Sequence, residues 1–256
     1  MPFDLVAWIE TQTATALSGV TAVADQQYTV SGDTVLVKKN KAFLGGVLQI
    51  GVTTPKICEF RQPSLRIPYR FTKAALTTVV DHRAGFTNML KRPLPLVAGE
   101  KLAAYVQNAS NEYSVIVAWL MSGYIDPKPV NPTHIITADI DSTLTANVWN
   151  SVTPTFDQDL PKGRYEVLGM NIGSYLANCQ PIVTRLVIPD SPDRVGVITN
   201  EITADKTINV NELTAPETVW NAMQGIEFDH DRLPTLEMLS LTADTDHILS
   251  LTLRKK

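Results

Sequence analysis

The chain has 256 residues, of which 44% are hydrophobic and 19% charged, so we expect a folded globular protein. Its net charge of −4 and the absence of a long basic block argue against a protein that mainly neutralises nucleic-acid phosphates. Cys58 and Cys179 are too few for a disulfide framework, and neither has the CxxC neighbour of a zinc or redox site.

Residues 1–23 are predicted to form an N-terminal amphipathic segment. We expect a helix over Asp4–Leu17, weakened by three threonines, with one apolar side formed by Leu5, Trp8, Ile9 and Leu17. No Lys or Arg precedes the short apolar run, as a signal peptide would require, and no stretch approaches the roughly 20 apolar residues that span a bilayer. We therefore expect a soluble protein made in the cytoplasm.

Alternation with a period of two residues dominates from residue 24 onward and predicts β-strands. Thr34–Lys38 places Val35 and Val37 on one face, and Lys101–Gln107 places three apolar side chains inward, Leu102, Ala104 and Val106. Val115–Met121 is apolar on both faces, so we expect a neighbour to cover the second face. About eight strand candidates in 24–123 favour a jelly-roll sandwich, with a weakly signalled helix near Asp81–Leu90.

The sequence contains an internal repeat. Phe43–Gly51 (FLGGVLQIG) resembles Tyr165–Gly173 (YEVLGMNIG), aligning Ile50 with Ile172 and, one deletion later, Cys58 with Cys179. Further matches in the same order are Ser64–Pro68 (SLRIP) with Arg185–Pro189 (RLVIP), and the alternating residues Tyr113, Val115, Val117 and Trp119 with His247, Leu249, Leu251 and Leu253. We infer two copies of one domain, 24–123 and 137–256.

A proline-rich linker, 124–136, is predicted between the copies, because the three prolines of GYIDPKPVNPT favour extended geometry. In the second copy, Thr214–Glu217 forms a capping box that predicts a helix ending near Gly225. In the last strand we expect the leucines at 249, 251 and 253 to face the core. The fold class is therefore all-β: two tandem jelly-roll-like antiparallel sandwiches with a few short helices.

Motifs that carry chemistry are missing from the sequence. There is no GxSxG, P-loop, GxGxxG or HExxH motif, and no HxH pair of the kind a metal cupin needs. Asp229-His230-Asp231 is better explained as a solvated loop, and Asp139 with Asp141 as a turn. We therefore expect no enzyme, and no catalytic, cofactor-binding or metal-binding residue. A sugar-stacking platform is conceivable from four aromatic residues, Tyr105, Tyr124, Tyr175 and Trp149.

The duplication, the short helices and the amphipathic N-terminal segment resemble a double jelly-roll major capsid protein of tailless icosahedral viruses with an internal membrane. The resemblance covers 24–256 and has no diagnostic motif. It implies a homotrimer with a pseudo-hexagonal footprint, assembled into a capsid lattice in the virion after synthesis in the host cytoplasm. It also implies minor capsid proteins and an internal membrane as partners, with no specific nucleic-acid binding.

Two groups of residues would then make contacts. An inner-face or membrane-proximal anchor is expected from Phe3, Leu5, Trp8 and Ile9, although the acidic residues and missing lysine of this segment depart from an anionic-lipid binder. A subunit-interface strand is expected from Val115, Val117, Trp119 and Met121.

Two other functions fit the same sequence. The first is a tandem β-sandwich module that binds carbohydrate or a receptor, as a viral spike or fibre component does. The second is a hydrolase whose paired carboxylates line a cleft, since the approach of two carboxylates is spatial and leaves no sequence motif.

Overall fold

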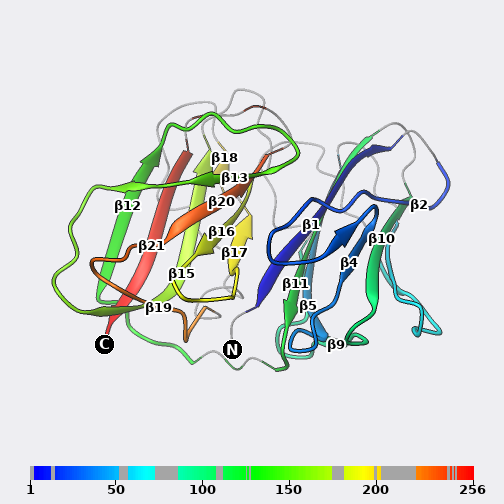
Figure 1. Cartoon of the computed structure of the whole chain (residues 1–256), viewed down its shortest axis with the longest axis horizontal. Coiled ribbons are helices and arrows are strands. Elements are labelled where there is room, and N and C mark those ends of the chain that lie inside the picture. The colour runs from blue at the N-terminus through cyan, green and yellow to red at the C-terminus, as the bar shows by residue number, and fades with distance from the viewer. Residues whose placement is uncertain are drawn as a thin grey trace. The chain divides into compact units, whose positions relative to one another are not determined.

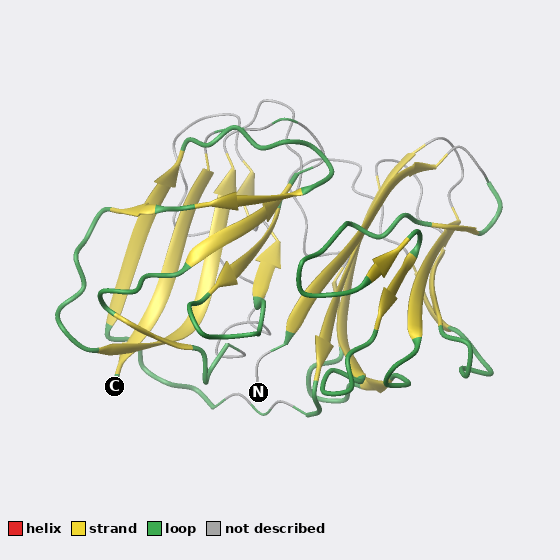
Figure 2. Cartoon of the chain, in the orientation of Figure 1, coloured by secondary structure: helices red, strands yellow, loops and turns green. Residues whose placement is uncertain are grey.

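The computed structural model consists of β-strands joined by loops, with no helix among the residues it describes (Figure 2). The described residues are 3–12, 15–51, 57–72, 86–107, 112–124, 126, 128–174, 182–198, 201–202, 223–240, 243, 245 and 247–256. The all-β class predicted from the alternating sequence is therefore confirmed. No helix of the described part is long and apolar enough to cross a membrane.

The chain divides into two compact units. The first unit is Leu5–Tyr124, and the second is Ile125–Lys256 together with Met1–Asp4. The strand β12 begins at His134, inside the stretch predicted as linker. Each unit consists of two sheets, and we describe each by itself (Figure 1).

The first unit is a sandwich of two sheets. One sheet has the order β1-β11-β5-β8 with β9 beside β5, and the other has the order β3-β4-β10-β6-β7 with β2 beside β10. Their strands are β1 (Asp4–Gln12), β2 (Ser18–Gly19), β3 (Val30–Ser31), β4 (Thr34–Leu36), β5 (Phe43–Gly51), β6 (Ile57–Arg61), β7 (Tyr69–Thr72), β8 (Phe86–Asn88), β9 (Leu94–Pro95), β10 (Lys101–Gln107) and β11 (Glu112–Met121).

The core of the first unit lies between these sheets. Trp8, Leu44 and Ile116 of one sheet and Phe60 and Leu102 of the other belong to a single buried cluster. Trp8 meets Phe60 edge to face, with ring centroids 5.6 Å apart. The predicted inward positions of Lys101–Gln107 are confirmed, since all three apolar side chains are fully buried.

The second unit also has two sheets. Their orders are β14-β12-β21-β15-β18, with β19 beside β15, and β13-β20-β16-β17. The strands are β12 (His134–Ile140), β13 (Trp149–Val152), β14 (Thr155–Phe156), β15 (Arg164–Ser174), β16 (Val183–Val187), β17 (Gly196–Ile198), β18 (Glu201–Ile202), β19 (Glu227–Asp229), β20 (Thr235–Leu239) and β21 (His247–Lys255). Leu249, Leu251 and Leu253 of β21 are fully buried, as predicted.

The two units share one strand order. We number the eight main strands of each unit along the chain, leaving aside β2, β3 and β9 in the first and β14 and β19 in the second. In both units one sheet then runs first, eighth, third, sixth, and the other second, seventh, fourth, fifth. This is the two-sheet arrangement of a jelly roll. The sixth strands differ in direction, because β8 is antiparallel to β5 whereas β18 is parallel to β15.

A β-bulge gives the residue-by-residue correspondence between the units. Gly45 is the extra residue in β5, opposite Trp119 and Leu120, and Leu168 is the extra residue in β15, opposite Thr252 and Leu253. Leu120 therefore corresponds to Leu253, although the sequence repeat aligned Trp119 with it. The repeat found the correct strands but was wrong by one residue, which interchanges the two faces of a sheet.

Another part of the repeat is also wrong. Arg185–Pro189 includes most of β16, whereas Ser64–Pro68 lies in the connection between β6 and β7. The two segments match in residue type only. The residues of Arg185–Pro189 include the end of a strand, whereas those of Ser64–Pro68 form a loop. Cys179 lies outside the described residues, so its match to Cys58 is not tested.

The predicted helix over Asp4–Leu17 is wrong, because these residues begin with the strand β1. The apolar run Leu5–Ile9 is continuous and is buried on both faces, a pattern typical of a covered strand. Pairing with β11 supplies hydrogen bonds along one edge of the strand, and residues 21 and 23 bond to Ile9 and Ala7 on the other. Phe86–Asn88 is strand where a helix near Asp81–Leu90 was predicted, and residues 81–85 lie outside the described part. Residues 214–222 of the predicted helix Thr214–Gly225 lie outside the described part of the chain.

Candidate functional site

The predicted membrane-proximal residues lie in the interior. Phe3 precedes β1, Leu5, Trp8 and Ile9 belong to it, and all four are at most 8% exposed. Trp8 also donates a hydrogen bond from Nε1 to the carbonyl oxygen of Asp33, at 3.0 Å. The role of these four residues as a membrane-proximal anchor stays a prediction.

The predicted subunit-interface residues are buried as well. Val115, Val117, Trp119 and Met121 alternate along β11 and are at most 2% exposed in the single chain. The expectation that both faces of this strand are covered is correct. Their assignment to a subunit interface stays a prediction.

The acidic residues weighed as metal ligands do not converge. Among the described residues, no group of three or more His, Cys, Asp or Glu side chains has the arrangement of a metal site. His230 Nδ1 lies 4.0 Å from Asp231 Oδ1, and the Asp231 side chain is 70% exposed. Asp139 and Asp141 are also exposed.

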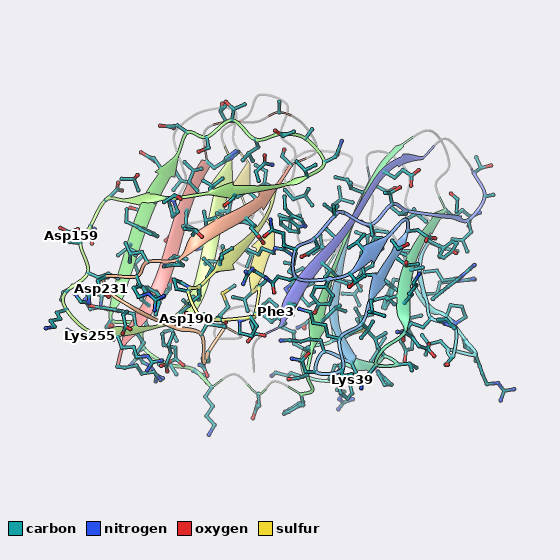
Figure 3. The ribbon with its side chains drawn as sticks, viewed as in Figure 1. Phe3, Lys39, Asp159, Asp190, Asp231 and Lys255 are labelled. Atoms are coloured by element: carbon teal, nitrogen blue, oxygen red, sulfur yellow. The ribbon has the colours of Figure 1, made fainter. Side chains whose placement is uncertain are left out.

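A polar pocket of about 300 Å³ opens in the second unit beside β19. Its charged lining consists of Arg164, Asp190, Asp193, Glu227, Asp229 and Arg232. Both arginines are paired, Arg164 Nε with Glu227 at 2.8 Å and Arg232 Nη1 with Asp190 at 2.5 Å. Asp190, one of the lining residues, is labelled in Figure 3. The pocket holds no nucleophile paired with a base, so it suggests no reaction.

Two aromatic residues weighed as sugar platforms are each covered by a guanidinium group. Arg61 Cζ lies 4.0 Å from the Tyr105 ring centroid, and Arg185 Cζ lies 3.9 Å from that of Trp149. Tyr105 and Trp149 belong to different units, and Tyr124 is 62% exposed. Tyr175 lies outside the described residues.

The most organised polar cluster is on the outer face of the sheet formed by β10, β6 and β7. Register places Tyr105, Glu59 and Arg70 in one row across the three strands. Glu59 accepts hydrogen bonds from Arg70 Nε at 2.9 Å and Nη2 at 2.5 Å, and from Arg61 Nε at 2.5 Å. The Glu59 side chain is 1% exposed, whereas those of Arg61 and Arg70 are 42% and 59% exposed.

The charge of Glu59 is maintained by these arginines. Burial raises the pKa of a carboxyl group, but hydrogen bonds and charge from Arg70 and Arg61 outweigh that effect and lower the pKa of Glu59. The same interaction raises the pKa of Arg61. One carboxylate held by two arginines leaves one excess positive charge on this face.

The corresponding strands of the second unit carry a similar pair. Arg185 on β16 lies opposite Glu237 on β20, with Nε 2.6 Å from Glu237 Oε2. The Arg185 side chain is only 1% exposed, in contrast to Arg61. The guanidinium group of Arg185 is therefore buried, whereas those of Arg61 and Arg70 are half-exposed.

The Glu59 cluster was missed from the sequence, although part of its signal is visible there. In ICEFR the alternation of Cys58 and Phe60 with Glu59 and Arg61 predicts a polar outer face on this strand. The third member, Arg70, is brought in by pairing of β6 with β7, which the alternation of one strand does not specify. No protein-family model, curated protein or solved structure matches the chain.

Proposed function

We propose that this chain is a structural virion protein, a major capsid protein that self-assembles as trimers with a pseudo-hexagonal footprint into an icosahedral shell. One observation carries the proposal: two consecutive units of the chain have the same jelly-roll strand order. A duplicated domain lets three copies present six similar bodies around one axis, which suits closed symmetric assembly.

The surfaces of the described residues favour a structural role over catalysis. The interior is filled by apolar side chains, and the polar clusters are arginine–carboxylate pairs rather than a nucleophile with its base. The resemblance to double jelly-roll capsid proteins supports the same proposal.

Sedimentation and electron microscopy of the purified chain test the proposal. We expect a trimer by sedimentation velocity, and rings or sheets by negative stain. A chain that stays monomeric at high protein concentration in every salt condition would overturn it. A monomer that binds members of a glycan array would instead support a tandem carbohydrate-binding module.

A further inference from the structure

The two units carry opposite net charge. Residues 5–124 contain 12 Lys and Arg against 7 Asp and Glu, whereas residues 1–4 and 125–256 contain 10 against 19. The first unit is therefore +5 and the second −9, a contrast that the overall value of −4 conceals. Two surfaces of opposite sign on one chain can attract each other between copies.

The exposed positive charge of the first unit includes the outer face of β10, β6 and β7. Arg61 and Arg70 are half-exposed there and share Glu59. Two further exposed cations flank them, Arg66 in the connection after β6 and Lys101 at the start of β10. We call Arg61, Arg66, Arg70 and Lys101 the basic face.

The second unit has an exposed acidic edge, formed by Asp139, Asp141, Asp157 and Asp159. The strands β12 and β14 pair there, with Asp139 opposite Thr155. Asp157 is fixed by Thr137, whose Oγ1 donates a hydrogen bond at 2.7 Å, and Asp159 follows at the rim of the unit (Figure 3). From residue 134 to 161 the sequence has no Lys or Arg, so no basic residue of this segment offsets these carboxylates.

We propose that copies of the chain associate head to tail, the basic face of one copy contacting the acidic edge of the next. This inference rests on the proposed function, because it names the surfaces through which the chain would assemble. Two basic faces, or two acidic edges, repel each other, so twofold pairing of identical surfaces is disfavoured. A contact between unlike surfaces repeats from copy to copy and can close into a ring.

The comparison of the units supports the proposal that a second copy of the chain binds over the basic face. Arg185, on the strand corresponding to β6, is buried against Trp149, and its partner Glu237 is 12% exposed. In the first unit Glu59 is buried, but its partners Arg61 and Arg70 are half-exposed. The carboxylate-rich edge of a second copy would supply negative charge complementary to the excess positive charge of the basic face.

Charge reversal tests this contact. Arg66→Glu with Lys101→Glu reverses two exposed cations and leaves the Glu59 cluster intact. We expect association in 50 mM salt to weaken about 100-fold, because attraction becomes repulsion at the contact. The matched control is Lys39→Glu with Lys91→Glu, which makes the same change of net charge at exposed positions of the same unit outside the basic face. Sedimentation velocity measures association, and circular dichroism verifies that each variant is folded.

Restoration makes the test specific. Adding Asp139→Lys, Asp141→Lys and Asp159→Lys to the Arg66→Glu, Lys101→Glu variant makes the edge net positive opposite a net negative face. This change should return association to within about tenfold of the wild type. Two results would overturn the contact while leaving the proposed function standing, provided that the wild type assembles. The first is a charge-reversed variant that assembles as well as the wild type. The second is a control variant that loses as much association as the charge-reversed variant. If the wild type never assembles, the proposed function fails first.

Discussion

Glu59 is nearly fully buried and still ionised, because Arg61 and Arg70 lie against both carboxylate oxygens. A carboxyl group whose pKa is lowered by folding contributes stability above its unfolded pKa. That contribution is lost as the pH falls through the lowered pKa of the folded state. The cluster therefore stabilises the first unit at neutral pH and ceases to do so in acid.

Glu59→Gln should lower the free energy of unfolding by about 1–3 kcal/mol at pH 7, since the charged hydrogen bonds are lost at a buried position. The loss should shrink at acid pH, as the wild-type carboxylate becomes protonated as well. Urea denaturation at both pH values measures the difference. Glu227→Gln is the control: its partner Arg164 is 63% exposed, so we expect a change below about 0.5 kcal/mol. An equal loss at both pH values would contradict the assignment.

Gly45, the extra residue of the first bulge, is required by close packing. A Cβ atom at this position would lie 2.0 Å from Met121 Sδ and 3.1 Å from Leu90 Cδ2. Met121 is fully buried, so its side chain has little room to move, and Gly45→Ala should cost about 1–3 kcal/mol. Combining it with Met121→Ala should cost less than the sum of the single changes, as urea denaturation of all three variants would show. Strict additivity would contradict this contact.

At the scale of elements, alternation in the sequence predicted strands that have one apolar and one polar face. In Lys101–Gln107 the three predicted inward residues are buried, and Ala103, predicted to face outward, is buried as well. The strand β1 was missed because its two faces are both apolar, and a short continuous apolar run has neither the period of a helix nor that of a strand.

Correspondence between the units was predicted at the level of strands but not of residues. A bulge inserts one residue at Gly45 and one at Leu168, and similar residue types flank both. The better sequence match therefore aligned opposite faces of the sheet. The Glu59 cluster shows the same limit, because Arg70 reaches Glu59 through strand pairing, which depends on distant parts of the chain.

Gly196 on β17 shows how strongly strand pairing constrains single residues. A Cβ atom there would lie 2.2 Å from the carbonyl oxygen of Thr184 and 2.8 Å from Arg185 Cα. These are backbone atoms of the neighbouring strand, so Gly196→Ala must separate β17 from β16. We expect a larger loss than for Gly45→Ala, more than about 3 kcal/mol, because no side chain can move aside. Urea denaturation of the two variants side by side measures the order, and the reverse order would contradict it.

At the scale of the whole molecule, duplication followed by divergence of charge explains how one chain can carry two unlike surfaces. The units keep one strand order, yet their net charges are +5 and −9. Identical units would pair in several ways with similar energy. Because the two units have opposite net charge, contacts between two first units or between two second units are repulsive. Contacts between a first unit and a second unit remain favourable, so repulsion provides the specificity.

A mixing experiment follows from this alternation. The Arg66→Glu, Lys101→Glu chain has two acidic surfaces, and the Asp139→Lys, Asp141→Lys, Asp159→Lys chain has two basic ones, so neither should associate alone. Mixed in equal amounts, the two variants should bind each other. Strict alternation of the two variants permits closed rings only with even numbers of copies. A ring of three copies would contain one contact between two chains of the same variant. Native mass spectrometry should therefore find mixed pairs or longer chains and little three-copy ring. Abundant three-copy rings containing both variants would contradict the head-to-tail contact.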